Sequence, residues 1–339
     1  MSNLSLVIKG AAFRAGDRFL RNRAALARRR LRVHLGYVWD HSPFYRQYWA
    51  DHGIGRAMLA DIELEDLPKT NQELLMENLD DVFTDRRLNR AELECWMQEN
   101  PDPDAQLFER YHVVQTSGSF GTSGIFVFDE RALETLGAEM MVKVGYTKRQ
   151  FTQRTRAVYL GTTHGRVAGR VLSRNLLPSL YDVQLCSVMD EPLEKIVKEL
   201  NAFQPDQITG HDVALARLVS YAQTGALQIN PEFIVATGDR ITESTRQAVS
   251  SAWGVEPVEL YGKAECLLGV KRSGDDSFHI FDNIALVEAE ESIEDDHARV
   301  VITNLYNRTT PIIRYETRDR IIAGDRFMGN CVSSIQSFV

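Results

Sequence analysis

The sequence predicts an α/β fold in which helices cover a largely parallel sheet, joined to a smaller antiparallel β unit. From about residue 107 to 262, short apolar runs that suit buried strands alternate with stretches that suit helices. Alternation of this kind is typical of a parallel sheet with helices on its faces. From 278 to 322 the pattern becomes β-rich, which favours antiparallel strands.

The individual elements follow from this pattern in order along the chain. The expected strands of the alternating region lie at 158–160, 183–185, 207–208 and 232–236, and the expected helices at 131–144, 191–203, 213–222 and 243–253. In the third of these helices, the apolar residues at helical spacing are expected to be buried: Val213, Ala216, Leu218, Val219 and Ala222. Later strands are expected at 284–288, 299–303 and 312–315, and the stretch 333–339 resembles another strand.

Length and composition indicate a soluble globular protein. A chain of 339 residues allows about two domains, and 44% hydrophobic with 25% charged residues is ordinary for such proteins. We expect a mainly helical segment at 1–95, an α/β core at 96–275 and a β-rich subdomain at 276–339. No apolar run approaches the roughly 20 residues of a transmembrane segment, and no signal peptide is apparent. Four scattered cysteines without a C-x-x-C pair are consistent with a reducing cytoplasm.

Positive charge is concentrated near the start of the chain. The net charge is −8, yet residues 1–50 hold ten Lys and Arg against two Asp and Glu. Apolar residues are interleaved with these arginines, which predicts one or two basic amphipathic helices. We expect this segment to dock onto the acidic remainder of the chain; an acidic carrier protein, a membrane surface and nucleic acid are the alternatives. Because no motif of a nucleic-acid-binding family is present, no nucleic-acid partner is expected.

The first of three informative segments is a loop, 115–124, with the sequence Gln-Thr-Ser-Gly-Ser-Phe-Gly-Thr-Ser-Gly. Strand-like runs at 111–114 and 125–128 flank it. A turn of this composition can direct backbone N–H groups and hydroxyls at one anion, and glycine lets the backbone approach a phosphate closely. Within this loop no lysine follows a glycine, so a Walker loop does not fit. A strand rather than a helix follows the loop, so a dinucleotide fingerprint does not fit either. An ordinary hairpin is the alternative.

The other two segments supply polar groups next to expected strands. The second, Tyr-Gly-Lys-Ala-Glu at 261–265, ends a strand at Gly262. Tyr261 offers an aromatic face for a purine, and Glu265 offers an oxygen ligand for Mg²⁺. The third, Pro-Ile-Ile-Arg-Tyr-Glu-Thr-Arg-Asp at 311–319, ends in Asp319, whose carboxylate can accept two hydroxyl donors. The alternatives are a surface turn and an exposed Arg–Asp pair.

In order and spacing, these three segments resemble the adenylate-forming superfamily of acyl-CoA synthetases. The stretches 42–46, 64–68 and 304–309 are similar to its phenylacetate–CoA ligase branch, including the capsule-biosynthesis-type and coenzyme-adenylating relatives. The resemblance runs from about Val38 to Arg326. It implies the large N-terminal domain of these enzymes, with helix-covered sheets and a small distorted β-barrel. In the family a mobile C-terminal domain that supplies a lysine for adenylation comes next, and we expect it to be absent from this sequence. Either the chain was cut at that boundary or the natural protein lacks the domain, and the strand-like end at 333–339 favours a cut.

The resemblance also implies roles for individual residues. The expected catalytic residues are Glu265, which is also the expected metal ligand, Thr116 and Thr122. The expected nucleotide-binding residues are Ser117, Gly118, Ser119, Gly121, Gly238, Asp239, Tyr261, Gly262, Arg314 and Asp319, with Asp319 binding the ribose. His164 and Gly165 are expected to line the acid pocket. The chain departs from the family pattern at two positions, since Thr122 stands where the loop usually carries a lysine and Arg318 where many members have a small residue.

The expected function is that of an AMP-forming, ATP-dependent acid–thiol ligase. It would activate a carboxylic acid, with an aryl acid among the candidates, as an acyl-adenylate and pass the acyl group to a thiol such as CoA. ATP and Mg²⁺ are therefore expected, an acidic carrier protein is a second candidate acceptor, and a homodimer is an open alternative to a monomer. Acyl or adenylyl transfer to an amine or hydroxyl in cofactor or natural-product biosynthesis is the nearest alternative. A non-catalytic nucleotide- or carrier-binding homologue is the alternative from another class.

Overall fold

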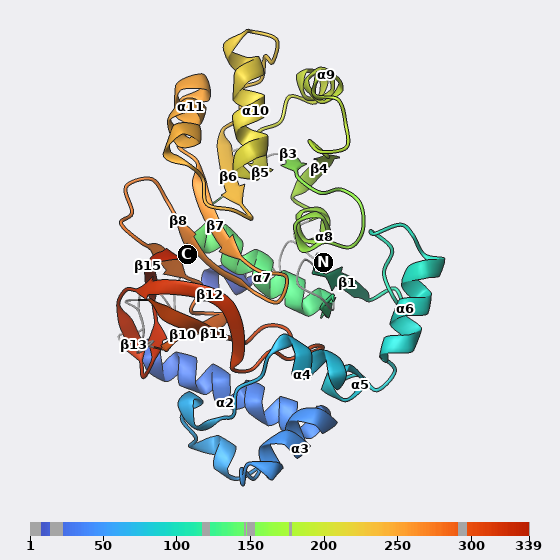
Figure 1. The fold of residues 1–339 in the computed structure, drawn as a ribbon, viewed down its shortest axis with the longest axis vertical. Coiled ribbons are helices and arrows are strands. Elements are labelled where there is room, and N and C mark those ends of the chain that lie inside the picture. Colours follow the sequence, from blue (N-terminus) through green and yellow to red (C-terminus); the bar gives the residue numbers. More distant parts are fainter. Residues whose placement is uncertain are drawn as a thin grey trace.

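The computed structural model describes residues 8–13, 23–116, 123–145, 147, 153–175, 178–290 and 297–338. Helices α2 (Arg23–His41) and α3 (Pro43–Asp51) lie at one end of the molecule, and α9 (Leu193–Phe203), α10 (Asp212–Gln223) and α11 (Glu243–Trp253) lie at the other (Figure 1). Strands occupy the space between these two groups of helices. The remaining early elements are η1 (Met58–Ala60), η2 (Leu64–Asp66), α4 (Gln72–Glu77), α5 (Leu79–Val82) and α6 (Arg90–Glu99).

One half of the main sheet is parallel, as the alternating sequence predicts. Its strands lie in the order β4 (Tyr181–Cys186), β3 (Thr155–Leu160), β5 (Gln207–Gly210), β6 (Phe233–Thr237) and β7 (Val258–Gly262). Each neighbouring pair is parallel. The predicted α/β fold is therefore confirmed.

The other half of the sheet is antiparallel and continues directly from β7. It contains β8 (Leu267–Lys271), β9 (Phe278–Ile280), β10 (Ala285–Glu290), β11 (Ala298–Asn304), β12 (Tyr315–Ala323), β13 (Arg326–Met328), β14 (Cys331–Val332) and β15 (Ser334–Phe338). Thirteen of the described strands thus form one mixed sheet, and the pairings among them do not close into a barrel. A separate antiparallel hairpin joins β1 (Tyr111–Gln115) to β2 (Ile125–Asp129), on either side of the Ser/Thr/Gly-rich loop.

The two faces of the parallel strands have different neighbours. Because side chains alternate between the faces of a strand, every second residue shares one environment. One face packs into a core with α9, α10 and α11 and presents Val158, Leu160, Ile208, Ile234 and Ala236. The opposite face turns towards α7 (Glu130–Lys143) and α8 (Ala168–Asn175), and it forms the floor of the pocket described below.

Helix α10 buries a different stripe from the one expected. Ala214, Leu215, Leu218 and Val219 are buried, whereas Val213 is 54% exposed and Ala216 is also exposed. Apolar residues occur around most of this helix, so spacing alone does not select a face. Packing against α11 and β6 makes that selection.

The strand expected at 312–315 begins only at Tyr315. Arg314 has a φ of 45°, which is left-handed backbone that cannot continue a strand. Thr70 stabilises this turn, since its N–H donates to the Arg314 carbonyl at 2.8 Å and its hydroxyl donates to the Ile313 carbonyl at 2.9 Å. The correction follows from a partner more than two hundred residues away in the sequence.

Arginines of the basic segment contact acidic and polar groups of the body. Arg23 forms an ion pair with Asp282, and Arg30 donates to the Asn283 side chain at 2.7 Å. Arg28 and Arg32 approach Glu63 and Asp61 at 3.3 and 3.8 Å. The earlier arginines at 14, 18 and 21 lie outside the described residues. Docking of this segment on the chain's own surface therefore holds for the part that the structure describes.

No helix within the described ranges is long and apolar enough to cross a membrane. The four cysteines are free: Cys95 is exposed, and Cys186, Cys266 and Cys331 are buried.

Candidate active site

A pocket of about 1080 Å³ lies over the face of the parallel strands that is not covered by α9, α10 and α11. The five parallel strands, β3 to β7, supply its floor. Their lining residues are Ala157, Tyr159, Tyr181, Val183, Gln207, Thr209, Phe233, Val235, Thr237, Leu260 and Gly262. Helices α7 and α8 supply the opposite wall through Met140, Met141, Ala168, Gly169 and Leu172. A side chain at Gly169 would collide with the Tyr159 hydroxyl, so α8 needs glycine there to lie this close to β3.

The polar end of this pocket brings the three sequence segments together. Thr116 comes from the first segment, Glu265 from the turn after β7, and Asp319 from β12. Sheet order alone does not explain the meeting, because β9 and β15 separate β12 from β8. Hydrogen bonds from Tyr261 to Asp319 and from Tyr315 to Glu265 join β12 to the β7–β8 segment. Polar groups from distant parts of the sequence thus face one cavity.

Glu265 is held rigidly at the bend between β7 and β8. Reciprocal backbone hydrogen bonds between Lys263 and Cys266 close this turn at 2.8 and 3.3 Å. The Glu265 side chain is buried, and its Oε1 accepts a hydrogen bond from the Tyr315 hydroxyl at 2.8 Å. The Asn304 amide donates to the Glu265 carbonyl at 2.9 Å. Burial raises the pKa of Tyr315 far above its ordinary value, and the Glu265 charge adds to the shift, so the phenol remains a neutral donor.

Asp319 is the centre of a second polar group on the lining. The Tyr261 hydroxyl donates to Oδ2 at 2.6 Å, and Lys263 Nζ lies 3.1 Å from both carboxylate oxygens. Burial raises the pKa of Tyr261 well above its ordinary value, with the Asp319 charge as a further cause. Tyr261 itself is not part of the lining, and its ring contacts Phe278 edge-on. Its position therefore suits support of Asp319 rather than the expected stacking on a purine.

Gly238 and Gly262 also line the pocket, as the sequence suggested. Gly238 has a φ of 88°, and a Cβ there would collide with the His211 ring, so this turn requires glycine. Asp239, by contrast, is 80% exposed at the side chain and does not belong to the lining.

The base of the Ser/Thr/Gly-rich loop is closed by Thr116 and Gly124. The Thr116 N–H donates to the Gly124 carbonyl at 2.9 Å, and the Gly124 N–H donates to the Thr116 hydroxyl at 2.7 Å. The remaining loop residues expected at the site lie outside the described ranges: Ser117, Gly118, Ser119, Gly121 and Thr122.

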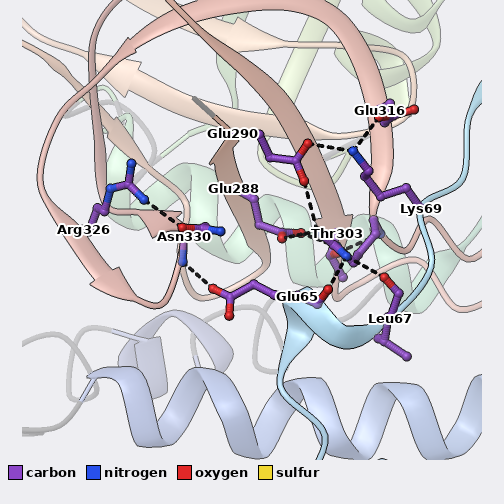
Figure 2. Close-up of polar contacts among 10 residues, drawn as sticks. Glu65, Leu67, Lys69, Glu288, Glu290, Thr303, Glu316, Arg326 and Asn330 are labelled. Carbon is purple, nitrogen blue, oxygen red and sulfur yellow. Dashed lines mark hydrogen bonds and ion pairs between the residues drawn. The ribbon is translucent and has the colours of Figure 1, made fainter. Parts of the chain in front are cut away.

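Arg314, expected to bind nucleotide, is buried and absent from the pocket lining. It belongs to a cluster of charges, of which Glu65, Glu288 and Glu290 are labelled in Figure 2. Its guanidinium donates to Glu288 Oε2 and Glu290 Oε1 at 3.1 Å each, and to the carbonyls of Glu65 and Leu67. Figure 2 shows Lys69 between Glu290 and Glu316, at 2.7 and 2.8 Å. We therefore correct the expectation for Arg314: its side chain ties the segment around Glu65 to β10.

His164 and Gly165 do not lie on the pocket lining either. The His164 side chain is 76% exposed, and its Nδ1 is 3.4 Å from Asp190 on the surface. Gly165, with a φ of 64°, turns the chain between β3 and α8. The pocket is lined instead by side chains of the sheet face and of α7.

Several lining residues were not expected from the sequence. His211 follows β5 as Gly238 follows β6, so the rule that ligand groups follow strand ends could have found it. Asn71 lines the pocket while its side chain accepts a hydrogen bond from the Leu74 N–H and so caps α4. Tyr159 and Phe233 gave no signal, because aromatic residues in apolar strands usually belong to a core.

No protein-family model matches this chain. Protein CapK of Staphylococcus aureus is 19% identical over 309 residues, which cover 87% of this chain and 62% of that protein. A structure of 2-hydroxyisobutyryl-CoA ligase in complex with 2-HIB-AMP and CoA, in the thioesterification state, has a TM-score of 0.64 at 16% identity and covers 92% of this chain and 66% of that one. The complex of VinN with L-aspartate has a TM-score of 0.50 at 11% identity and covers 72% and 66% of the two chains.

At identities this low, the structural matches show that this chain shares its fold with those proteins. The chain spans about 62% of the length of the curated relative that it matches.

Proposed function

We propose that this chain, which has the fold of the adenylate-forming superfamily, belongs to an enzyme that uses ATP to activate a carboxylic acid as an acyl-adenylate for transfer to a thiol such as CoA. One observation carries the proposal: the buried Glu265 and the supported Asp319 face the polar end of a pocket whose other end is apolar. An acyl-adenylate has the same division, with a polar nucleotide joined to an acyl group. The ligase structure that shares this fold holds 2-HIB-AMP and CoA, which supports the same chemistry here.

The polar end suits a nucleotide. Asp319 can accept hydrogen bonds from ribose hydroxyls, because an ionised carboxylate has about four acceptor sites. Tyr261 uses one of them, and the Lys263 ammonium shares both oxygens in the ligand-free protein. Gly238 lets the backbone at the end of β6 lie close to a flat ligand. Thr116 places a hydroxyl and the base of the loop at the same end of the pocket.

The apolar end suits the acyl group. Met140, Met141, Leu172, Val183 and Phe233 line it between the sheet and the helices. Burying a charged acyl tail among such side chains would be costly, so an uncharged alkyl or aryl acid is the substrate that the lining favours. The identity of the acid is left to the experiment below.

The donor set at Glu265 is compatible with Mg²⁺. This ion is usually held by one or two protein carboxylates together with substrate phosphates. Within the described residues there is no group of three or more His, Cys, Asp or Glu side chains that could hold a metal alone. Glu265 Oε1 accepts from Tyr315, and the carboxylate keeps further acceptor capacity towards the pocket. When bound, the ion would neutralise phosphate charge.

In the proposed reaction an oxygen of the acid attacks the α-phosphorus of ATP, and the bond to the pyrophosphate leaving group breaks. Glu265, fixed by Tyr315 and by the turn after β7, would hold the metal end of the triphosphate. Asp319 would hold the ribose, and the apolar wall would keep water from the acyl group. Orientation of the two reactants is therefore the main contribution of these residues.

Two other functions remain alternatives. Acyl or adenylyl transfer to an amine or hydroxyl would use the same first step, so the acceptor, including CoA or an acidic carrier protein, must be tested separately. A non-catalytic binder of the same fold would need no buried metal ligand, and the retention of Glu265 at the pocket argues against it.

The decisive measurement is acid-dependent exchange of labelled pyrophosphate into ATP, with adenylates formed from a carboxylic-acid library identified by mass spectrometry. We expect exchange with uncharged alkyl or aryl acids and none without acid. Nucleotide binding without exchange, across a library that covers both classes, would favour the non-catalytic alternative.

Asp319→Ala is expected to weaken ATP binding by about 1–3 kcal/mol, because the ribose hydroxyls lose their acceptor. Discrimination between ATP and its deoxyribose analogues should fall with it. Isothermal calorimetry on both proteins measures the two effects. Equal affinity of the variant and the parent for ATP would contradict the ribose assignment.

A further inference from the structure

The side chain of Lys263 connects the two polar groups of the pocket. It projects from the turn that carries Glu265, and its Nζ reaches both oxygens of Asp319 at 3.1 Å. The side chain is 24% exposed and lies on the pocket lining. A lysine in this position is accessible to a ligand, and the reciprocal hydrogen bonds of its turn fix its backbone.

The charge of the lining gives this lysine a particular importance. Four carboxylates belong to the described lining: Glu73, Glu265, Glu316 and Asp319. The lysines and arginines of the same described lining are Lys263 and Arg318. Lys69, behind the lining, neutralises Glu316 at 2.8 Å. A triphosphate would therefore meet a pocket whose described lining is predominantly acidic, which is unfavourable unless a cation is present.

The Ser/Thr/Gly-rich loop does not provide that cation. Residues 115–124 contain no lysine or arginine. Loop N–H groups and hydroxyls can hold an anion by hydrogen bonds, but they carry no net charge. The positive charge must come from another element of the pocket or from a metal ion.

We propose that Lys263 binds the phosphate of the nucleotide and replaces a loop lysine in this site, with Asp319 as its counter-ion in the free protein. This inference rests on the proposed function, because it assumes that a nucleotide occupies the pocket. The four-carbon stem of lysine rotates freely, so the ammonium can move from Asp319 to a phosphate oxygen while its backbone stays in place. Asp319 keeps the hydrogen bond from Tyr261 and can accept ribose hydroxyls in exchange for the ammonium.

Arg318 is a weaker candidate for the same role. It follows Thr317 on β12 and its side chain is exposed, whereas Lys263 is less exposed and adjoins Glu265. A charge screened by solvent interacts less strongly with a phosphate than one at the inner wall. Lys195 serves as the matched control, because it lies on α9, its side chain is 56% exposed and it is absent from the pocket lining.

Calorimetric titration of Lys263→Gln with adenosine and with AMP separates phosphate binding from any effect through Asp319. We expect the affinity for AMP to fall roughly 10- to 100-fold, as for loss of a hydrogen bond to a charged group, and the affinity for adenosine to change less than about threefold. Lys263→Arg should restore most of the AMP affinity because it keeps the charge. Lys195→Gln should change AMP affinity less than about threefold.

Each other outcome overturns the inference in a recognisable way. Equal losses for adenosine and AMP would mean that Lys263 acts only by holding Asp319. Unchanged AMP affinity in Lys263→Gln, with normal acid-dependent pyrophosphate exchange in the parent, would remove Lys263 from the site and leave the proposed function intact. A parent protein that binds neither adenosine nor AMP would refute the nucleotide site itself. Unfolding midpoints of all variants, measured in urea, show that the differences arise in the folded state.

Discussion

Glu265→Gln is expected to lower Mg²⁺-dependent adenylation by about 100- to 1,000-fold or more while the protein stays folded. Removing one preorganised group that stabilises charge in a transition state has costs of this size. Glutamine has nearly the same shape, and its amide oxygen can still accept the hydrogen bond from the Tyr315 hydroxyl. The change therefore removes the negative charge and leaves the buried contacts largely in place.

The measurement is pyrophosphate exchange at increasing Mg²⁺, with an acid that the parent protein accepts. Glu256→Gln is the matched control, because Glu256 is exposed, bonded to Ser250 and absent from the pocket lining. It should exchange at the parent rate. Full activity and an unchanged Mg²⁺ dependence in Glu265→Gln would remove this residue from the mechanism.

Arg314→Met is expected to destabilise the fold by about 3–5 kcal/mol, the usual cost of removing one partner of a buried ion pair. Glu288 has no exposed surface, and Arg314 Nε donates to it at 3.1 Å. Arg314 Nη2 also lies 2.9 Å from Glu288 Oε1, in an ion pair whose geometry is not that of a hydrogen bond. Methionine fills similar space but leaves this carboxylate with no cation beside it. Urea unfolding at pH 7.5 measures the loss.

The pH dependence distinguishes this explanation from simple loss of packing. Burial raises the pKa of Glu288 from 4.5 to about 7, although Arg314 opposes the shift. Between these values the folded protein keeps a proton that the unfolded chain has released, so the free energy of unfolding should fall as pH rises from about 4.5 to 7. Without Arg314 the carboxylate should hold its proton more tightly still, and the penalty should therefore be smaller at pH 5 than at pH 7.5.

The double variant Arg314→Met with Glu288→Gln completes this test. Neutralising the carboxylate should recover a large part of the stability lost at pH 7.5, because no unpaired charge stays buried. It should also flatten the pH dependence. A penalty for Arg314→Met that is equal at both pH values, and unaffected by Glu288→Gln, would show that the charge pair contributes little.

Parts of the site were predictable because they depend on local chemistry. The strand–Gly–Glu pattern at 258–265 identified a turn with a carboxylate, and the structure places Glu265 on the lining. Asp319, Thr116 and Gly238 were also named from their segments and lie there. His164 and Arg314 were also expected at the site but do not lie on the lining. The direction of a side chain depends on its three-dimensional neighbours, which the local sequence does not specify. For Arg314 those neighbours are Glu288 and the carbonyls near Glu65.

The sequence by itself determined the class of fold and the positions of most strands. Alternating apolar strands and helices require a covered parallel sheet, since such strands must bury both faces. The tertiary structure decided which face of that sheet became core and which became pocket. Ile234 and Val235 are apolar neighbours on β6, yet Ile234 packs into the core with α9 to α11 and Val235 lines the cavity. The alternation of side chains along a strand divides its residues between two faces, but it does not show which face becomes core. The helices that pack on each face decide that.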